Sequence, residues 1–457
     1  MYSIVIKNKK FHHDVEELIK LFMDKNSFRI IENTDDTNDM SLKGFVIPDH
    51  LTGKQEIKRF LYNYFSENLK YYPPWGTLTG IRPTKIVNEL FNNEKSEDEV
   101  RRVLSEEYLL HMNKIDLLIA TTMNQSNINK SLQKNSISIY IGIPFCPSRC
   151  SYCSFTSYEI NEDRSSRYLQ ALFKEISHVS KAIVRKDIIV ENIYIGGGTP
   201  TSLSNRQFQE LLQYIDSSFD LKKLKEFTVE AGRPDTINQI KLDSLVMKHC
   251  NRISINPQSM NEKTLIEIGR KHTVEEFTKA YALIKETGIK AVNMDLIAGL
   301  PNENIDDFKY TVEKVAELCP ENITIHNLAI KRAARLKDNI CKDESKLIKP
   351  IELVEMIESS YSIMLKNSYL PYYLYRQKDM LGNLENIGYS KKGYESIYNV
   401  RIMEENQTII ALGAGGVSKI YYPEENRLER IPNVSNFQIY IDRIDEMIKR
   451  KNIDIFE

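Results

Sequence analysis

The middle of the chain alternates two kinds of segment, and this alternation constrains the fold more than any other feature of the sequence. Runs rich in β-branched residues occupy residues 137–143, 192–195, 226–230, 252–255, 291–297 and 322–326. Stretches with apolar residues at intervals of three and four lie between them, among them 168–184, 205–215, 275–285 and 305–318. Strands that alternate with amphipathic helices form parallel sheets, so the pattern predicts six successive βα units. Six units give an α/β fold with a partial (βα)6 barrel, in which functional groups gather at the carboxyl ends of the strands.

The length of the chain, 457 residues, exceeds what a single hydrophobic core usually organises. We therefore predict an N-terminal α/β accessory domain, the barrel core, and a C-terminal α+β region that covers the substrate, at residues 1–134, 135–345 and 346–457. Outside the core, the patterns predict strands near 2–6 and 44–47, helices over 14–24, 351–366 and 437–449, and a loop-rich tract over 367–393.

Three of the six cysteines follow the first predicted strand directly, as Cys146, Cys150 and Cys153. Six cysteines over this length are too few for a disulfide scaffold, so free thiols in a reducing compartment are expected. The Cys-x-x-x-Cys-x-x-Cys spacing predicts a loop that wraps three thiolates around one corner of a cubane iron–sulfur cluster, leaving the fourth iron without a protein ligand. A zinc site is the alternative, with His272 or His326 as its fourth ligand after folding.

Further chemical residues follow the other predicted strands and are expected at the same edge of the sheet. The glycine run at 196–198, with Thr199 after it, lets backbone amides approach an anionic or zwitterionic group. Glu230 is suited to hold a cationic amine, and Asp295 to accept hydrogen bonds from ribose hydroxyls. The alternative for each acid is a salt-bridged or capping side chain.

Together these residues resemble the radical S-adenosylmethionine (SAM) superfamily. Residues 140–155 are similar to the family's cluster loop, and residues 196–200 to its glycine motif for the methionine amine. The resemblance implies a [4Fe–4S] cluster held by the three cysteines, SAM as cofactor, and catalytic roles for the cysteines and Tyr140. The cofactor contacts that it implies are Tyr140, Tyr152, Gly197, Gly198, Thr199, Glu230, Gln258, Arg270, Asp295 and Ala329.

More narrowly, the sequence resembles the oxygen-independent coproporphyrinogen III oxidase-like family. Residues 80–84, Asn256-Pro257 and residues 326–332 look most like its coproporphyrinogen dehydrogenase branch, called HemZ. The resemblance implies heme biosynthesis, in which a 5′-deoxyadenosyl radical starts the oxidative decarboxylation of propionates to vinyl groups, giving protoporphyrinogen IX. It also implies porphyrinogen or heme as the ligand and an electron donor such as flavodoxin or ferredoxin.

Departures from the family pattern keep other functions open. The oxidase proper has a histidine and a fourth cysteine where this chain has Gly142 and Ser154. Residues 393–399 look more like the heme-chaperone relatives, although Tyr398-Asn399 stands where these carry His-Asn. A heme-binding or heme-delivery protein and a radical SAM enzyme that modifies heme therefore remain alternatives.

The charge and hydropathy of the chain bear on its partners and its location. The net charge of −1 gives no support for nucleic-acid binding driven by bulk electrostatics. No uninterrupted apolar run reaches about 18 residues, and the N-terminus turns charged after a short apolar run, so we expect a cytoplasmic protein without a membrane span. Lys331, Arg332 and Arg335 are candidate partners for propionates, or else a solvated helix face.

Overall fold

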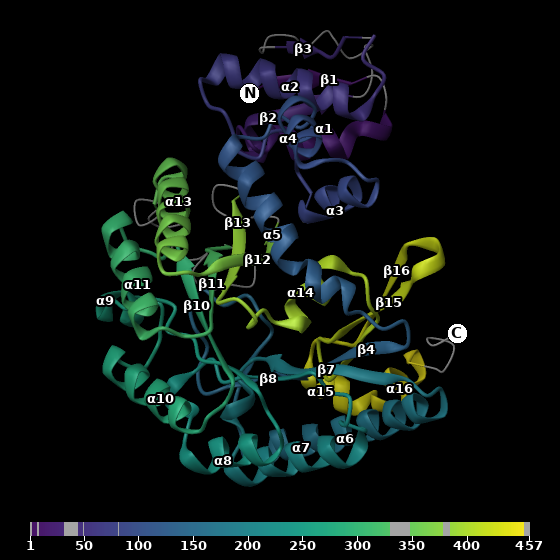
Figure 1. The fold of residues 1–457 in the computed structure, drawn as a ribbon, viewed down its shortest axis with the longest axis vertical. Helices are drawn as coiled ribbons and strands as arrows, with labels where there is room; N and C mark the ends of the chain where they lie inside the picture. Colours follow the sequence, from purple (N-terminus) through teal and green to yellow (C-terminus); the bar gives the residue numbers. More distant parts are fainter. Residues whose placement is uncertain are drawn as a thin grey trace. The chain divides into compact units, whose positions relative to one another are not determined.

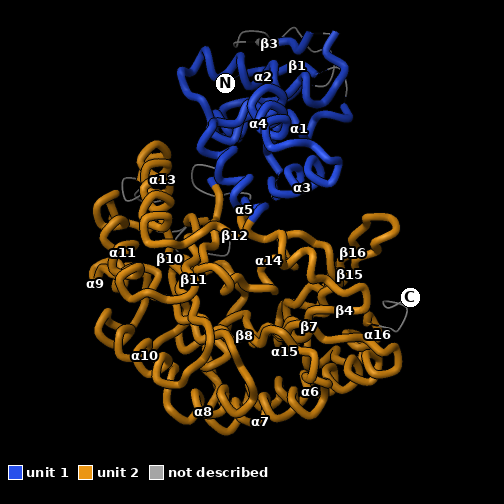
Figure 2. The backbone as a smooth tube through the Cα atoms, in the orientation of Figure 1, with its two compact units in different colours: residues 1–123, 375–378, 382–384 blue, residues 124–374, 379–381, 385–457 orange. Residues whose placement is uncertain are grey.

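The computed structural model describes residues 2–6, 9–31, 44–48, 50–80, 82–329, 348–377 and 384–451. These residues belong to two compact units, coloured separately in Figure 2. The smaller unit comprises the described residues of 1–123, 375–378 and 382–384, and the larger unit comprises those of 124–374, 379–381 and 385–457. The domain boundaries at residues 134 and 345 stay predictions.

The smaller unit is built on a three-stranded parallel sheet in the order β2-β1-β3. Two of these strands and the first helix were predicted, whereas β2 was not. Ile4, Val15, Leu18, Leu61 and Phe65 form the centre of its apolar core, which the sheet shares with α1 and α2. Its elements are β1 (Tyr2–Val5), α1 (His12–Ile19), β2 (Phe28–Ile31), β3 (Gly44–Val46), α2 (Lys54–Leu69), α3 (Thr84–Asn92) and α4 (Glu97–Glu106), and α5 (Met112–Lys130) begins in it.

The larger unit contains the predicted barrel. All six predicted strands exist, lie next to one another in chain order and run parallel, which confirms the α/β partial barrel. They are buried on both faces, as strands of a parallel sheet covered on each side are. The six are β4 (Ser136–Ile143), β7 (Ile189–Gly197), β8 (Glu226–Glu230), β9 (Arg252–Ser254), β10 (Ala291–Ala298) and β11 (Asn322–Asn327).

Helices follow these strands around one side of the sheet, as Figure 1 shows for α6, α7, α8, α10 and α11. Several begin with a capping box; Ser204, for example, accepts from the backbone N–H of Gln207, whose side chain accepts in turn from the N–H of Ser204. The helix bounds are α6 (Glu162–Arg185), α7 (Asn205–Ser218), α8 (Gln239–Met247), α9 (Glu262–Glu267), α10 (Val274–Glu286) and α11 (Ile305–Leu318).

The C-terminal region differs from its prediction. The tract over 367–393 was predicted as loop, but it contains β12 and β13, and β13 pairs antiparallel with β11. The prediction was wrong because β13 is buried along its whole length and has no polar–apolar alternation. The helix predicted over 437–449 is broken at Arg443 into two. The elements are α13 (Pro350–Lys366), as predicted, β12 (Leu370–Arg376), β13 (Glu385–Ser390), α14 (Ile397–Glu404), β14 (Ile409–Leu412), β15 (Val417–Tyr422), β16 (Arg427–Pro432), α15 (Phe437–Asp442) and α16 (Ile444–Arg450).

Late segments of the chain therefore flank the barrel strands on both sides. The sheet order is β12-β13-β11-β10-β9-β8-β7-β4-β14-β15-β16. β14 pairs parallel with β4, and β13 pairs with β11 at the opposite end of the six. Within the described residues, no helix is long and apolar enough to cross a membrane.

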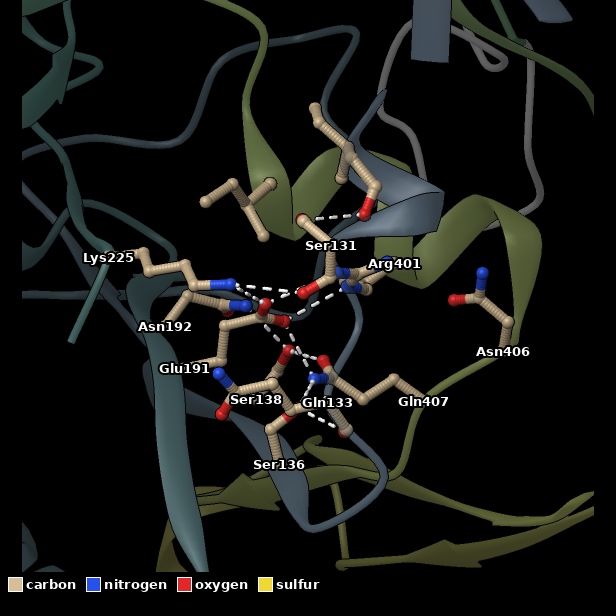
Figure 3. A network of polar contacts seen from close by, with 12 residues as sticks. Ser131, Gln133, Ser136, Ser138, Glu191, Asn192, Lys225, Arg401, Asn406 and Gln407 are labelled. Atoms are coloured by element: carbon tan, nitrogen blue, oxygen red, sulfur yellow. Dashed lines mark hydrogen bonds and ion pairs between the residues drawn. The ribbon is translucent and has the colours of Figure 1, made fainter. Parts of the chain in front are cut away.

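Helix α14 is fixed to the amino ends of two barrel strands. The Glu226 carboxylate, at the start of β8, accepts hydrogen bonds from Ser396 Oγ (2.9 Å) and from the backbone N–H groups of Ile397 (2.9 Å) and Tyr398 (3.1 Å). Near the start of β7, Glu191 is ion-paired with Arg401 at 3.0 Å, and both side chains are buried (Figure 3). A buried charge is energetically costly unless it is paired, so these contacts hold α14 against the sheet.

Candidate cluster and cofactor site

The cysteine loop is closed at its base by a short parallel ribbon beyond the carboxyl end of β4. The ribbon pairs β5 (Phe145–Cys146) with β6 (Tyr158–Glu159). Backbone hydrogen bonds from Tyr158 N to Pro144 O and from Ile160 N to Cys146 O, both 2.9 Å, fasten the two ends of the loop. Cys146, Cys150 and Cys153 all carry free thiols, Cys150 buried and the other two half-buried. An ordered segment thus presents three thiols together.

Polar groups from neighbouring loops contact two of the thiols. Thr199 Oγ1 donates to Cys146 Sγ at 3.5 Å, and Arg233 Nη1 donates to Cys150 Sγ at 3.9 Å and to Ser148 Oγ at 3.0 Å. Arg233 is buried and is held by a two-point ion pair with Asp235. A buried cation and a hydroxyl beside the sulfurs stabilise negative charge there, a charge that thiolate ligands carry.

The glycine run packs directly on the cysteine loop. The backbone N–H of Gly198 donates to Ile143 O (2.8 Å), and that of Thr199 donates to Phe145 O (2.7 Å). A Cβ at Gly198 would lie 2.5 Å from Phe145 O and 3.0 Å from Cys146 Sγ, so only glycine allows this approach. Gly197 has φ +109°, a conformation that other residues rarely adopt.

Glu230, the last residue of β8, turns its carboxylate toward the glycine run. It accepts hydrogen bonds from the Tyr194 hydroxyl (2.5 Å) and from the backbone N–H of Gly197 (3.2 Å). Burial raises the pKa of Glu230 to about 7, helped by the nearby charge of Asp295 and opposed by the Tyr194 hydrogen bond. A carboxyl group that is half ionised near neutral pH is suited to receive a cationic amine.

The backbones of Asp295, in β10, and Gln258, just after β9, are hydrogen-bonded to each other. Gln258 N donates to Asp295 O (3.0 Å), and Gln258 itself is buried with φ +68°. The Asp295 carboxylate accepts from Asn293 Nδ2 at 2.7 Å and lies 3.8 Å from His326 Nε2. Burial alone would raise the pKa of Asp295, but the hydrogen bonds and charge of His326, with Asn293, outweigh it, and the pKa is lowered.

Arg270 connects the cysteine loop to the loop after β8. Its Nη2 donates to the Tyr152 hydroxyl (2.8 Å), and its Nη1 donates to Gly232 O (2.7 Å). The Tyr152 ring packs on an apolar cluster made of Leu265, Ile268, Ile297, Leu300 and Leu328. Tyr152 and Arg270, both expected to contact the cofactor, therefore contact each other, while Ala329 is half-buried just after β11.

The predicted residues thus form direct pairs around one edge of the barrel, together with residues that the sequence reasoning missed. Arg233 was missed, although its position three residues after Glu230 was a usable signal. Tyr194 was missed as well; it lies two residues before Gly196, hence on the same face of β7. Lys331, Arg332 and Arg335 lie outside the described residues.

The similarity to known proteins agrees with this geometry. The sequence profile of the radical SAM superfamily matches residues 140–315. The oxygen-independent coproporphyrinogen-III oxidase-like protein HemZ of Bacillus subtilis is 41% identical over 419 residues, which is 89% of this chain and 83% of that protein. The chain belongs to the radical SAM superfamily.

Two further similar proteins are more distant than HemZ. The heme chaperone HemW of Escherichia coli is 28% identical over 63% of this chain and 71% of its own. The solved structure of coproporphyrinogen III oxidase (HemN) from Escherichia coli superposes with a TM-score of 0.56 at 22% identity, covering 70% of this chain and 72% of that one. The shared fold is therefore that of a HemN-like radical SAM protein.

Membership of the radical SAM superfamily brings a [4Fe–4S] cluster and SAM, and makes the chain a radical SAM oxidoreductase. The residues fit both groups: three free thiols on one closed loop, a glycine run too tight for a Cβ, and a half-buried carboxyl group beside it. Across the described ranges, no three His, Cys, Asp or Glu side chains are arranged to hold one metal ion.

We predict that Gly198→Ala disturbs the radical SAM cluster loop. The added Cβ must displace Phe145 O or Cys146 Sγ, and such overpacking costs about 1–3 kcal/mol. We expect the iron content after anaerobic reconstitution to fall and SAM cleavage to drop about tenfold or more. Gly80→Ala is the matched control, because a Cβ there would have nothing within 4 Å. Equal iron content and cleavage in the two variants would show that the close approach is unimportant.

Proposed function

We propose that this radical SAM oxidoreductase converts the propionates of coproporphyrinogen III to vinyl groups without oxygen, giving protoporphyrinogen IX. The observation that carries the proposal is the similarity to HemZ over 89% of the chain, which extends beyond the barrel into both flanking regions. A cytoplasmic location and an electron donor of the flavodoxin or ferredoxin type are part of the same proposal.

In this proposal, Cys146, Cys150 and Cys153 hold the cluster. Gly197, Gly198, Thr199 and Glu230 receive the methionyl part of SAM, since the Thr199 hydroxyl lies 3.5 Å from Cys146 Sγ and the Glu230 carboxylate contacts the backbone of Gly197. The further contacts with SAM that we propose are Tyr140, Tyr152, Gln258, Arg270, Asp295 and Ala329. When bound, the two groups supply a 5′-deoxyadenosyl radical that abstracts a hydrogen atom from a propionate side chain.

The interior of the barrel offers a polar, largely buried surface for the substrate. Asn293 Nδ2 donates to Ser254 Oγ (3.0 Å), Thr324 Oγ1 donates to Asn293 Oδ1 (3.1 Å), and the Thr324 and Tyr373 hydroxyls lie 3.2 Å apart. These groups already satisfy one another, so they remain in place while water is excluded from a reactive intermediate.

A heme-binding or heme-delivery role is the second candidate, and Gly142 gives the specific observation in its favour. A Cβ at Gly142 would lie 3.3 Å from Ala414 O and 3.5 Å from Leu412 O, so the loop after β14 occupies space that a larger side chain needs. The histidine that the oxidase proper carries at this position therefore has little room here. This departure supports a function that differs from that of the oxidase, as in a chaperone or an enzyme that modifies heme.

Product analysis distinguishes these functions. We expect reconstituted protein, incubated anaerobically with coproporphyrinogen III, SAM and a strong reductant, to yield products that have lost one and then two carboxyl groups by mass spectrometry. Formation of 5′-deoxyadenosine without porphyrinogen turnover, together with tight heme binding, would replace the oxidase by heme delivery. Consumption of heme instead would favour an enzyme that modifies heme.

A further inference from the structure

Three tyrosines form a compact aromatic group next to the Glu230 carboxylate. Tyr194 of β7 and Tyr398 of α14 are stacked with their ring centroids 4.4 Å apart and an interplanar angle of 24°. Tyr140 of β4 lies beside both, with centroids 6.1 Å from Tyr194 and 6.3 Å from Tyr398. Stacked aromatic pairs contribute beyond the area they bury, so each ring restricts the orientation of the next.

Within this group, Tyr194 contacts Glu230, and the Tyr140 hydroxyl lies beside Gly197. The Tyr194 hydroxyl donates to Glu230 Oε1 at 2.5 Å, while Glu230 Oε2 accepts from the backbone of Gly197. A Cβ at Gly196 would lie 2.8 Å from Glu230 Oε2 and 2.9 Å from Tyr194 Cε1. The chain thus leaves room for this tyrosine–carboxylate pair by having no side chain between its members.

Tyr398 is held by helix α14, whose contacts with the sheet fix its position. The backbone N–H of Tyr398 itself donates to the Glu226 carboxylate, and Asn399 Nδ2 donates to the Tyr372 hydroxyl at 3.1 Å. One turn further along α14, Arg401 makes its buried ion pair with Glu191. Tyr398 therefore presents its ring to Tyr194 from a fixed backbone, and is itself 5% exposed.

We propose that Tyr194 and Tyr398 are positioning residues for the SAM amine: α14 stacks Tyr398 on Tyr194, and the Tyr194 hydroxyl in turn orients the Glu230 carboxylate toward the glycine run. The inference rests on the proposed assignment of Glu230 to that amine. It gives a part in cofactor binding to the C-terminal region, which lies outside the residues matched by the superfamily profile.

The charges around Glu230 determine the sign of the effect. A hydrogen bond donated to a carboxylate stabilises its ionised form, so loss of the Tyr194 hydroxyl raises the pKa of Glu230 above about 7. Asp295 acts in the opposite direction to the hydroxyl, and His326 in the same direction. The groups that face Glu230 are Tyr140 from β4, Tyr194 from β7, Asp295 from β10, His326 from β11 and Tyr398 from α14.

The first test needs no cofactor. We expect the carboxyl infrared band of Glu230, assigned by its absence in Glu230→Gln, to titrate near pH 7 in the unloaded protein. In Tyr194→Phe the midpoint should rise by about one pH unit, the scale of a hydrogen bond to a charged group. Tyr398→Leu should raise it in the same direction, and Tyr398→Phe, which keeps the ring, should restore the wild-type midpoint. Unchanged midpoints in Tyr194→Phe and Tyr398→Leu would overturn the inference.

The second test measures SAM binding by equilibrium dialysis on reconstituted protein without reductant. We expect Tyr194→Phe to bind SAM about fivefold more weakly than wild type at pH 7 and equally at pH 9, because the ionised fraction of Glu230 falls only at the lower pH. Tyr214→Leu is the matched control, since it removes a stack of similar geometry, with Phe173 at 4.2 Å, that involves none of the residues around Glu230.

The outcomes distinguish the positioning role of the two tyrosines from the assignment of Glu230 to the SAM amine, on which that role depends. If Glu230→Gln leaves SAM affinity unchanged, then Glu230 does not hold the amine and the proposed site is wrong. If Glu230→Gln weakens SAM binding while Tyr194→Phe and Tyr398→Leu behave like wild type at both pH values, then the site stands and the positioning role is refuted. A loss in Tyr214→Leu as large as that in Tyr398→Leu would mean that only general packing is involved.

Discussion

Cys150→Ala is expected to abolish both the visible absorption of the cluster and reductive SAM cleavage. Cys150 is the buried member of the three thiols, and the Arg233 guanidinium lies 3.9 Å from its sulfur. Without that thiolate a second iron has no protein ligand, and the buried cation faces a site with one negative charge less. Iron and sulfide analysis after anaerobic reconstitution, an absorption spectrum, and the yield of 5′-deoxyadenosine measure the loss.

The matched control is Cys319→Ala, which removes an exposed thiol at the end of α11, far along the chain from the cysteine loop. We expect this variant to keep full iron content and cleavage. An unchanged far-ultraviolet spectrum in Cys150→Ala would show that the fold survives, so that the loss is specific to the cluster. Wild-type absorption and cleavage in Cys150→Ala would refute its assignment as a ligand.

Arg401→Met is expected to lower the free energy of unfolding of the larger unit by about 3–5 kcal/mol, because it leaves the Glu191 carboxylate buried without its principal cation. Gln407 Nε2 still donates to Glu191 at 2.8 Å, and Lys225 Nζ lies 2.9 Å from it at the margin of the network (Figure 3). Neither replaces the two hydrogen bonds of the guanidinium, of 3.0 and 3.2 Å. The midpoint and slope of urea unfolding, followed anaerobically, give the change.

Lys225→Met is the control for this prediction. It removes the other cation of Glu191, but the Lys225 side chain is 36% exposed, and partly solvated ion pairs contribute only about 0–1 kcal/mol. Equal destabilisation by the two substitutions would mean that burial of the Arg401 pair has no special weight. Because Arg401 and Tyr398 both lie on α14, we also expect Arg401→Met to weaken SAM binding.

The barrel could be predicted because each of its strands is marked by residues that are adjacent in the sequence. Each of its six strands contains β-branched residues, and β8 was predicted with its observed bounds, Glu226–Glu230. Parallel strands end at one edge, so residues that follow them gather there, and Glu230, Gln258 and Asp295 do.

The remaining elements depend on long-range contacts that periodicity does not reveal. β13 is covered on both faces and includes Gly388, where a Cβ would meet the Tyr373 ring at 1.8 Å. A glycine inside a strand usually weakens it, but here Gly388 makes room for an aromatic side chain from the neighbouring strand. Arg233 and Tyr194 were missed for a related reason. Tyr194 contacts Glu230, 36 residues away in the chain, and Arg233 contacts Ser148, 85 residues away.

The placement of β13 and β14 also dictates an order of assembly. The six barrel strands are complete at residue 327, yet the strands that cover their two outer edges are made only from residues 385–390 and 409–412. A nascent chain therefore carries two unpaired strand edges until residues 385–412 have been synthesised, and such edges invite mispairing. The sheet behind the cysteine loop, which follows the first barrel strand, is closed only after residue 412 has been made.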